Sequence, residues 1–365
     1  MMQTHHGEPS FHLGTPEVDL SVTARGGHMA PVVFHLSGRD VSPYSLSPWQ
    51  PSEYPDVPPL LSVLRGDFLC LPFGGQDEGP PHGEAANHGW QEIESNDRSL
   101  RLRIACSDTG ATVEKSLAIR PGQQAVYLEN RISGLAGDFN YGTHPILDFS
   151  GISAGRVTTS AIRWASVYPG NFSDPSAGES QALAPGGRFT DLRAVPLADG
   201  GITDLSVYPA RAGNDDLVMF THLAATAEQP FAWTAAVLDG YVWFSLKDPA
   251  DFPSTLLWLS NGGRSAAPWN SRHTARLGIE DVCSHFSDGV NTSRLDLLAH
   301  ESIPTTRRFQ PNEPVSLRNI HAVAAWPAEN GAIVTITPMG DCRVRLTGEH
   351  GDACDVSLDW KFILE

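Results

Sequence analysis

The sequence predicts an all-β protein built from antiparallel sheets. Three observations point to this class: hydrophobic residues often repeat at every second position, turn-forming residues are frequent, and helical periodicity longer than two turns is hard to find. Of the 365 residues, 34 are Gly and 28 are Pro, while 41% of the chain is still hydrophobic. This composition favours a folded, turn-rich chain over a disordered one.

Residues 100–106 carry the clearest strand pattern, because Leu and Ile alternate there with Arg and Ala, as in a half-buried strand. Asp239 and Gly240 separate two later runs and predict a hairpin whose turn needs positive φ at both central positions. The best short helix candidate is 294–300. Further strand-like runs occupy 112–119, 125–132, 217–222, 231–238, 241–246, 255–260, 315–326, 333–337, 342–347 and 355–363.

Pro and Gly are spread along the chain, and no internal repeat is evident. We therefore predict one large antiparallel β domain over residues 1–326. Residues 327–365 are expected to form a C-terminal β-hairpin extension packed on the same domain. Two long irregular stretches, 42–59 and 171–187, are rich in Pro, Ser and Gly; loops of this length commonly cover a site or are mobile.

The charge balance argues against polyanionic partners. The chain has 25 basic and 42 acidic residues and a net charge of −17, so nucleic acid and anionic membrane surfaces would be repelled. No apolar run reaches the ~18 residues of a membrane helix, and no secretory signal pattern is visible. The five cysteines lack CxxC spacing, which favours reduced thiols. We expect a soluble, cytoplasmic protein.

Three places in the sequence combine groups that can do acid–base or metal chemistry. The loop at 81–90 holds two imidazoles, a carboxylate and an indole among Gly and Pro. His144 precedes the apolar, strand-like run 146–149. Glu280 and Asp281 end an apparent strand, where a side chain often contributes to a site.

These motifs, in this order, resemble the galactose mutarotase-like family, which includes aldose 1-epimerases and hexose-6-phosphate mutarotases. The resemblance implies an antiparallel β-supersandwich and spans about residues 20–326, as scattered short motifs. The stretches that carry it are GGHMAPVVF at 26–34, RGDFLCLPFG at 65–74, PHGEAANHGW at 81–90, GTHP at 142–145, GIE at 278–280 and QPNE at 310–313.

The resemblance implies an aldose 1-epimerase (mutarotase) acting on a small sugar, with His82, His144 and Glu280 as functional residues. Opening a sugar ring requires a base for the anomeric hydroxyl and an acid for the ring oxygen. We assign Glu280 as base and His144 as acid, with His82 hydrogen-bonding near the ring oxygen. Arg65 maps onto a substrate-contacting arginine, whose fork of donors can anchor hydroxyls or an anionic group.

Other substrate contacts are predicted less directly. Phe73 and Trp90 lie in the motif loops and can stack on the apolar face of a sugar, as can Trp164, Trp233 and Trp243. Family members also carry an acidic substrate ligand between the two halves of the chain. Asp199 is our choice for it, with Asp191, Asp204 and Asp248 as alternatives. Neither a cofactor nor a metal is expected.

The sequence also departs from the family pattern. Glu84 stands where an aromatic residue is usual, and Ala86 where an Arg is usual. Asp281 follows Glu280 in place of the usual Pro. Because neighbouring side chains on a strand face opposite ways, we expect Asp281 to point away from Glu280.

Two alternatives from other functional classes stay open. One is a carbohydrate-binding protein of the same fold without turnover, which the departures from the pattern favour. The other is a metal-assisted sugar isomerase or lyase whose ligands are His82, His88, His144 and Glu280. The His-x5-His spacing is not a known ligand pattern, and there is no HExxH. GxSxG, P-loop and GxGxxG motifs are also missing from the sequence.

Overall fold

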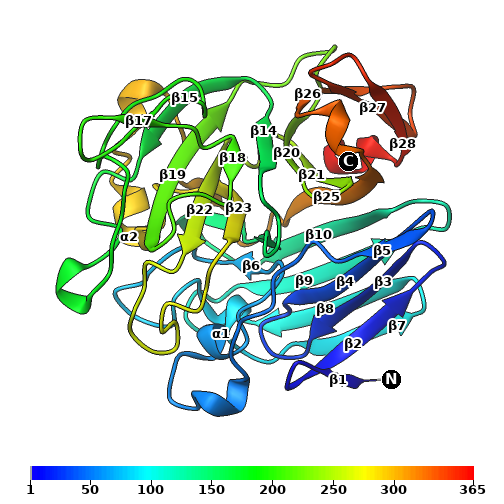
Figure 1. The fold of residues 1–365 in the computed structure, drawn as a ribbon. Coiled ribbons are helices and arrows are strands. Elements are labelled where there is room, and N and C mark those ends of the chain that lie inside the picture. The colour runs from blue at the N-terminus through cyan, green and yellow to red at the C-terminus, as the bar shows by residue number, and fades with distance from the viewer. Residues whose placement is uncertain (1) are drawn as a thin grey trace.

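The computed structural model describes residues 2–365, which form antiparallel sheets packed against one another (Figure 1). The largest sheet has nine strands. In spatial order these are β18 (Val207–Tyr208), β14 (Gly155–Thr159), β20 (Ala232–Val237), β21 (Tyr241–Lys247), β25 (Val315–Ala325), β10 (Ala125–Ser133), β9 (Thr112–Ile119), β8 (Ser99–Ala105) and β7 (Gln91–Asn96).

A seven-stranded sheet and a five-stranded sheet share the main apolar core with this large sheet. The seven-stranded sheet contains β15 (Ile162–Val167), β19 (Asn214–His222), β22 (Ser254–Asn261), β23 (Arg276–Cys283), β12 (Tyr141–Thr143) and β6 (Leu69–Cys70), with β13 (Ile146–Asp148) also paired to β23. The five-stranded sheet runs through β1 (Gln3–His5), β2 (Glu8–Gly14), β3 (Val18–Thr23), β4 (Met29–Leu36) and β5 (Arg39–Val41).

Helices are few and short. They are α1 (Pro59–Ser62), α2 (Gly289–Arg294) and the 3₁₀ turns η1 (Pro51–Glu53), η2 (Glu84–Ala86), η3 (Pro175–Ala177), η4 (Ala299–Glu301), η5 (Ala328–Asn330) and η6 (Trp360–Leu364). Two small ladders pair β11 (Gly137–Phe139) with β24 (Arg307–Phe309) and β16 (Val195–Pro196) with β17 (Ile202–Thr203). Within residues 2–365 no helix is long and apolar enough to cross a lipid bilayer.

The antiparallel all-β prediction is confirmed, and the alternation at 100–106 has the expected cause. In β8 the apolar side chains are buried and the intervening Arg side chains are exposed. The hairpin predicted at Asp239 and Gly240 joins β20 and β21, but only Gly240 has a positive φ, at 74°. The expectation of positive φ at both central positions is therefore wrong.

The chain ends in a three-stranded unit that covers the outer face of the large sheet. The unit contains β26 (Ile333–Pro338), β27 (Arg343–Gly348) and β28 (Ala353–Ser357), shown in orange and red in Figure 1. Its apolar side chains form one cluster with those of β20, β21 and β25, around the buried Trp326. The last predicted strand, 355–363, is wrong beyond Ser357, because the chain turns into η6.

Candidate active site

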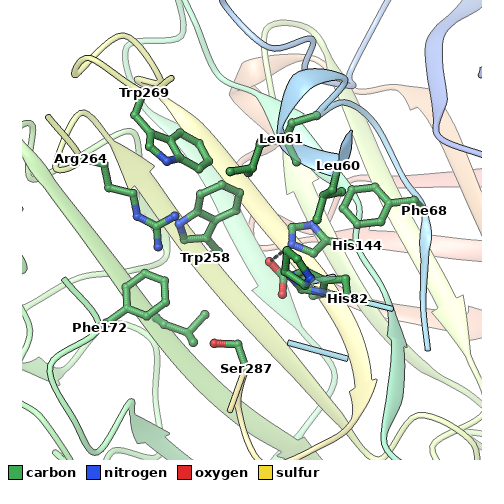
Figure 2. A pocket seen from close by; sticks show the side chains of 14 residues that line it. Leu60, Leu61, Phe68, His82, His144, Phe172, Trp258, Arg264, Trp269 and Ser287 are labelled. Carbon is green, nitrogen blue, oxygen red and sulfur yellow. Dashed lines mark ion pairs between the residues drawn. The ribbon is translucent and has the colours of Figure 1, made fainter. Parts of the chain in front are cut away.

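A cavity of about 240 Å³ lies on the face of the seven-stranded sheet that points away from the main core (Figure 2). Strands β19, β22 and β23 form its floor, and loops cover it. One of the two long irregular stretches contributes to the lining: Phe172 belongs to 171–187, whereas Leu60 and Leu61 lie just after 42–59. The lining residues are Leu60, Leu61, Leu64, Phe68, Pro81, His82, His144, Phe172, Leu217, Trp258, Arg264, Trp269, Glu280 and Ser287.

Strand pairing brings Glu280 and His144 together at this cavity. β23 pairs with both β12 and β13, and His144 lies in the short link between those two strands. The backbone N–H of Ile279 donates to the carbonyl of Pro145 at 2.8 Å. As a result Nε2 of His144 lies 3.3 Å from Oε1 of Glu280, and both side chains are buried (Figure 2).

The alternation of β23 separates Glu280 from Asp281, as expected. Asp281 faces the large sheet, where its carboxylate lies 2.5 Å from Nζ of Lys247 in β21. Both of these side chains are fully buried, and Thr255 also donates to the Asp281 carboxylate, at 2.7 Å. Asp281 thus has its own counter-charge and does not share the cavity with Glu280.

Aromatic rings hold the His144 imidazole in place. Its ring stacks on Phe68 with centroids 4.6 Å apart and meets Trp258 edge-on at 5.8 Å. The backbone N–H of His144 donates to Oδ1 of Asp67 at 3.0 Å. Among the described residues Nδ1 of His144 has no hydrogen-bond partner, although it is buried. Packing and backbone bonds, and not a ring hydrogen bond, therefore orient this imidazole.

His82 completes the polar end of the cavity. Its ring centroid lies 5.1 Å from that of His144, at an interplanar angle of 80°. The backbone N–H of Gly74 donates to Nδ1 of His82 at 3.3 Å. A neutral His82 whose Nδ1 accepts this bond carries its proton on Nε2, so that Nε2–H can donate to a ligand.

Burial shifts the proton affinities of this cluster in opposite directions. It raises the pKa of Glu280 well above its usual range, although nearby Arg264 works in the other direction. Burial, helped by His82, lowers the pKa of His144 well below its usual range. Burial also lowers the pKa of His82 to about 4. Each shift favours the neutral form of its group.

Arg264 lies at the opposite side of the cavity, within a cage of aromatic rings. Its guanidinium carbon is 5.0 Å from the Phe172 ring centre, 5.4 Å from Trp258 and 5.0 Å from Trp269, which is cation–π range. Nε lies 3.6 Å from Oδ2 of Asp215. Within residues 2–365 no hydrogen bond has the Arg264 side chain as donor, so the guanidinium can donate to a ligand in addition to its ion pair with Asp215.

The other predicted contacts do not line the cavity. Arg65 is fully buried and donates to the backbone carbonyls of Val63, His5 and His6, so it holds the N-terminal sheet instead of a ligand. Phe73 is buried behind His82, with ring centroids 5.0 Å apart.

Trp90 and Asp199 also lie elsewhere. The Trp90 indole donates to the carbonyl of Ala85 and packs near Gly27. Asp199 belongs to the exposed turn between β16 and β17, where it accepts from the N–H of Gly201 at 2.9 Å. None of the four residues predicted as substrate contacts, which are Arg65, Phe73, Trp90 and Asp199, lies in the lining of this cavity.

Sequence reasoning missed the aromatic and cationic half of the cavity. Arg264, Trp258 and Trp269 belong to no motif, and they meet His144 and Glu280 only through the pairing of β22 with β23 and the return of the following loop. One signal was available: Trp258 and Glu280 lie in consecutive strands, β22 and β23, which one loop joins. Without the pairing register, that signal does not select Trp258 among nine tryptophans.

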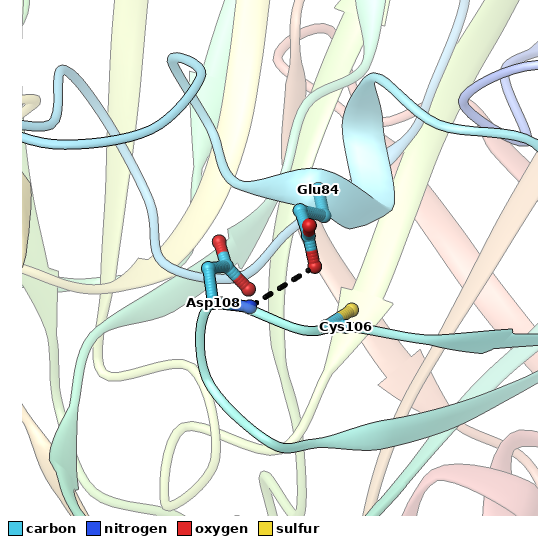
Figure 3. Close-up of side chains that lie close together, drawn as sticks. All are labelled: Glu84, Cys106 and Asp108. Carbon is cyan, nitrogen blue, oxygen red and sulfur yellow. Dashed lines mark hydrogen bonds between the residues drawn. The ribbon is translucent and has the colours of Figure 1, made fainter.

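The four residues of the metal alternative are divided between two places. His82, His144 and Glu280 line the cavity, whereas Nδ1 of His88 lies 3.5 Å from Oε1 of Glu84. In residues 2–365 the one group of three metal-ligating types whose atoms lie within 4.8 Å of one another is Glu84, Cys106 and Asp108 (Figure 3). The Glu84 carboxylate there accepts from Oγ of Ser107 at 2.6 Å and from the Asp108 N–H at 3.3 Å, which fastens η2 to the turn after β8.

Comparison with known proteins gives a structural match only. No protein-family description matches the sequence, and no curated protein is similar to it in sequence. A galactose mutarotase related enzyme from Lactobacillus acidophilus superposes with a TM-score of 0.54 at 10% identity, over 87% of this chain and 98% of that one. A galactose mutarotase-like protein from Lactobacillus casei gives 0.55 at 11% identity, over 86% and 100%. An aldose epimerase homologue from Caenorhabditis elegans gives 0.55 at 10% identity, over 87% and 99%.

The chain has the galactose mutarotase-like fold. Such low identity shows the fold alone, so the function must be argued from the site. The predicted resemblance is confirmed at the level of the fold, and the cavity gathers residues of four of the motif stretches, 65–74, 81–90, 142–145 and 278–280.

Proposed function

We propose that this chain is an aldose 1-epimerase-like isomerase, which interconverts the anomers of a reducing sugar. The observation that carries the proposal is the buried Glu280–His144 pair, 3.3 Å apart in the lining of the cavity. A cavity of about 240 Å³ lies below the ~300–1,000 Å³ usual for ligand pockets. This size favours a single sugar ring over an oligosaccharide.

The reaction needs one base and one acid, and the pair supplies both with a single proton. With the proton on His144, Glu280 removes the proton of the anomeric hydroxyl while His144 protonates the ring oxygen. The bond between the anomeric carbon and the ring oxygen breaks, and the anomeric carbon becomes an aldehyde. After rotation of the aldehyde group the two residues exchange roles. The ring hydroxyl then attacks the other face of the aldehyde carbon, and the ring closes as the other anomer.

His82 and Arg264 act on the bound sugar and not as proton carriers. The Nε2–H of His82 is available as a donor beside the reacting oxygens. Arg264, in place of the predicted Arg65, supplies free guanidinium donors at the other side of the cavity. Trp258 and Trp269 present rings to the cavity, on which the C–H face of a sugar can stack.

A panel of aldoses and sugar phosphates tests this function by two-dimensional exchange NMR, which reads the rate between anomer signals. The expected result is exchange well above buffer for at least one sugar, lost in Glu280→Gln and in His144→Asn. A chelator should leave the rate unchanged. A rate that falls with the chelator would instead support the metal-assisted alternative.

A non-catalytic sugar-binding protein is the second candidate, and one observation favours it. Burial raises the pKa of Glu280, which favours the protonated carboxyl group, and a protonated carboxyl group cannot act as the base. Line broadening of a sugar's signals without any anomer exchange would support this candidate over the enzyme.

A further inference from the structure

The cavity is divided into a polar end and an apolar wall. Glu280, His144 and His82 form the polar end. Four leucines also line the cavity, and we call them the leucine wall: Leu60, Leu61 and Leu64 in and after α1, and Leu217 in β19 (Figure 2 labels the first two). A leucine side chain has no donor or acceptor, so a ligand group that lies against this wall loses its hydrogen bonds to water and regains none.

One leucine of the wall is less buried than its neighbours in the chain. Leu61 is only half-buried, although it lies among the buried residues Leu60, Ser62 and Leu64, and it is one of the lining residues. Part of its apolar side-chain surface is therefore exposed at the cavity. A ligand that covers this surface removes it from water and gains hydrophobic free energy of binding.

The side chains that can bond sugar oxygens are few in this lining. Glu280 and His144 engage the anomeric and ring oxygens, and His82 can bond one neighbour. Arg264 and Ser287, on other sides of the cavity, can bond further hydroxyls. The ring positions that face the leucine wall contact only apolar side chains. A hydroxyl group there loses its hydrogen bonds to water, whereas a methyl group or a hydrogen atom loses none.

We propose that the preferred ligand is a deoxygenated or O-alkylated sugar, in which an apolar substituent replaces a hydroxyl on the side of the ring facing the wall of Leu60, Leu61, Leu64 and Leu217. The inference rests on the proposed function for the orientation of the ring, with its anomeric centre at Glu280 and His144. It concerns substrate class and assigns the wall as the specificity determinant.

Matched pairs of sugars test the preference: galactose with 6-deoxygalactose, glucose with 6-deoxyglucose, and glucose with 2-deoxyglucose and 3-O-methylglucose. At least one apolar member should have a kcat/KM for anomer exchange about 10- to 100-fold above its hydroxylated partner, the range for one mismatched group in a hydrophobic pocket. Equal values, or a preference for the hydroxylated member in every pair, would overturn the inference and leave the proposed function standing.

Two variants connect the preference with the wall. Leu61→Asn changes a half-buried side chain and should cut the preference at least fivefold, mostly by lowering kcat/KM for the apolar member. Leu61→Met keeps the wall apolar and should retain the preference, as should Leu295→Asn at an exposed leucine far from the cavity, 67% accessible. An unchanged preference in a folded Leu61→Asn protein would contradict the assignment of the wall.

A binding measurement keeps the inference separate from turnover. The 1,5-anhydro analogues of galactose and 6-deoxygalactose lack the anomeric hydroxyl and cannot react, so their Kd values report recognition alone. If no sugar exchanges but the deoxygenated analogue binds at least tenfold more tightly, the enzyme proposal fails and the ligand class stands. If neither analogue binds and no sugar exchanges, both proposals are overturned.

Discussion

Burial of the Glu280 carboxyl group, which is only 2% exposed, gives stability a specific pH dependence. Its pKa is raised above the usual 4.5, so the folded protein keeps a proton that the unfolded chain has already released. This contribution to stability is complete below the unfolded pKa and is lost as pH rises toward the folded pKa. Glu280→Gln has no proton to lose. Its stability relative to wild type should increase by up to about 1.4 kcal/mol per pH unit in that window.

Urea unfolding of wild type and Glu280→Gln at a series of pH values above 4.5 measures this slope. Glu84→Gln is the matched control, because the pKa of Glu84 is shifted in the opposite direction. Burial alone would raise the pKa of Glu84, but hydrogen bonds from Ser107 and Asp108 outweigh it and lower the pKa. Glu84→Gln should therefore be less stable than wild type at neutral pH. A stability difference for Glu280→Gln that does not vary with pH would contradict the assigned shift.

The two arginines separate a structural role from a binding role. Arg65→Gln should reduce the free energy of unfolding by about 3 kcal/mol, because buried carbonyls of the N-terminal segment lose charged donors, and should leave the KM of the folded protein unchanged. Arg264→Gln should raise KM about tenfold or more with little change in kcat and change stability by less than about 1 kcal/mol. The reverse pattern would restore Arg65 as the substrate contact.

At the residue scale the sequence predicted the polar half of the site and not the rest. His82, His144 and Glu280 each belong to a short motif, and a short motif can be recognised from residues that are adjacent in the sequence. Arg264 and Trp258 reach the cavity only through the register of β22 on β23 and a loop that returns over it. Arg65 also stands in a motif stretch, but the sequence does not show that its donors bond the carbonyls of the N-terminal segment.

At the scale of single elements, the Lys247–Asp281 pair joins β21 of the large sheet to β23 of the sheet that carries Glu280. Asp281→Asn removes the counter-charge and leaves Lys247 buried, which should cost about 3–5 kcal/mol. The double variant Lys247→Met/Asp281→Leu should recover most of this loss, because no charge then remains buried. Thermal or urea unfolding of the singles and the double gives the coupling energy, and an additive double variant would contradict a direct pair.

Elements with a clear period were predicted well, and those governed by tertiary contacts were not. β9 has the predicted bounds 112–119, because alternation and flanking turns are local signals. The helix predicted at 294–300 is wrong: α2 ends at Arg294, and Asp296 adopts a positive φ of 50°, which stops a helix. Leu295 and Leu297 of that stretch are exposed.

At the scale of the whole molecule, the C-terminal unit is expected to be required for a soluble fold. Its side chains Ile336, Val344 and Leu346 are fully buried against the outer face of β20, β21 and β25. Leu346→Asp should detach the unit, lower the unfolding temperature by several degrees and produce oligomers in size-exclusion chromatography. Val334→Asp, at a half-exposed position of the same unit, is the control. A monomeric Leu346→Asp protein of wild-type stability would show that the unit is dispensable.

The overall architecture was predictable because composition and alternation act over the whole chain, whereas the arrangement of sheets was not. Nothing in the period of β22 or β23 tells which face meets the large sheet, since both faces of these strands are buried. The position of the cavity, on the outer face beneath loops, depends on that choice. The family resemblance indicated the position of the site only because it assigned His144 and Glu280 to the same site.

The most direct test is the anomer exchange rate of the best sugar from the panel, measured by exchange NMR for wild type, Glu280→Gln and Glu84→Gln under identical conditions. Proton transfer by a positioned group contributes about 10²–10⁴-fold. We predict that Glu280→Gln loses at least a hundredfold in rate while it remains folded and binds the sugar, and that Glu84→Gln keeps its rate. Exchange by Glu280→Gln within a few-fold of wild type would contradict the Glu280–His144 pair as the acid–base machinery.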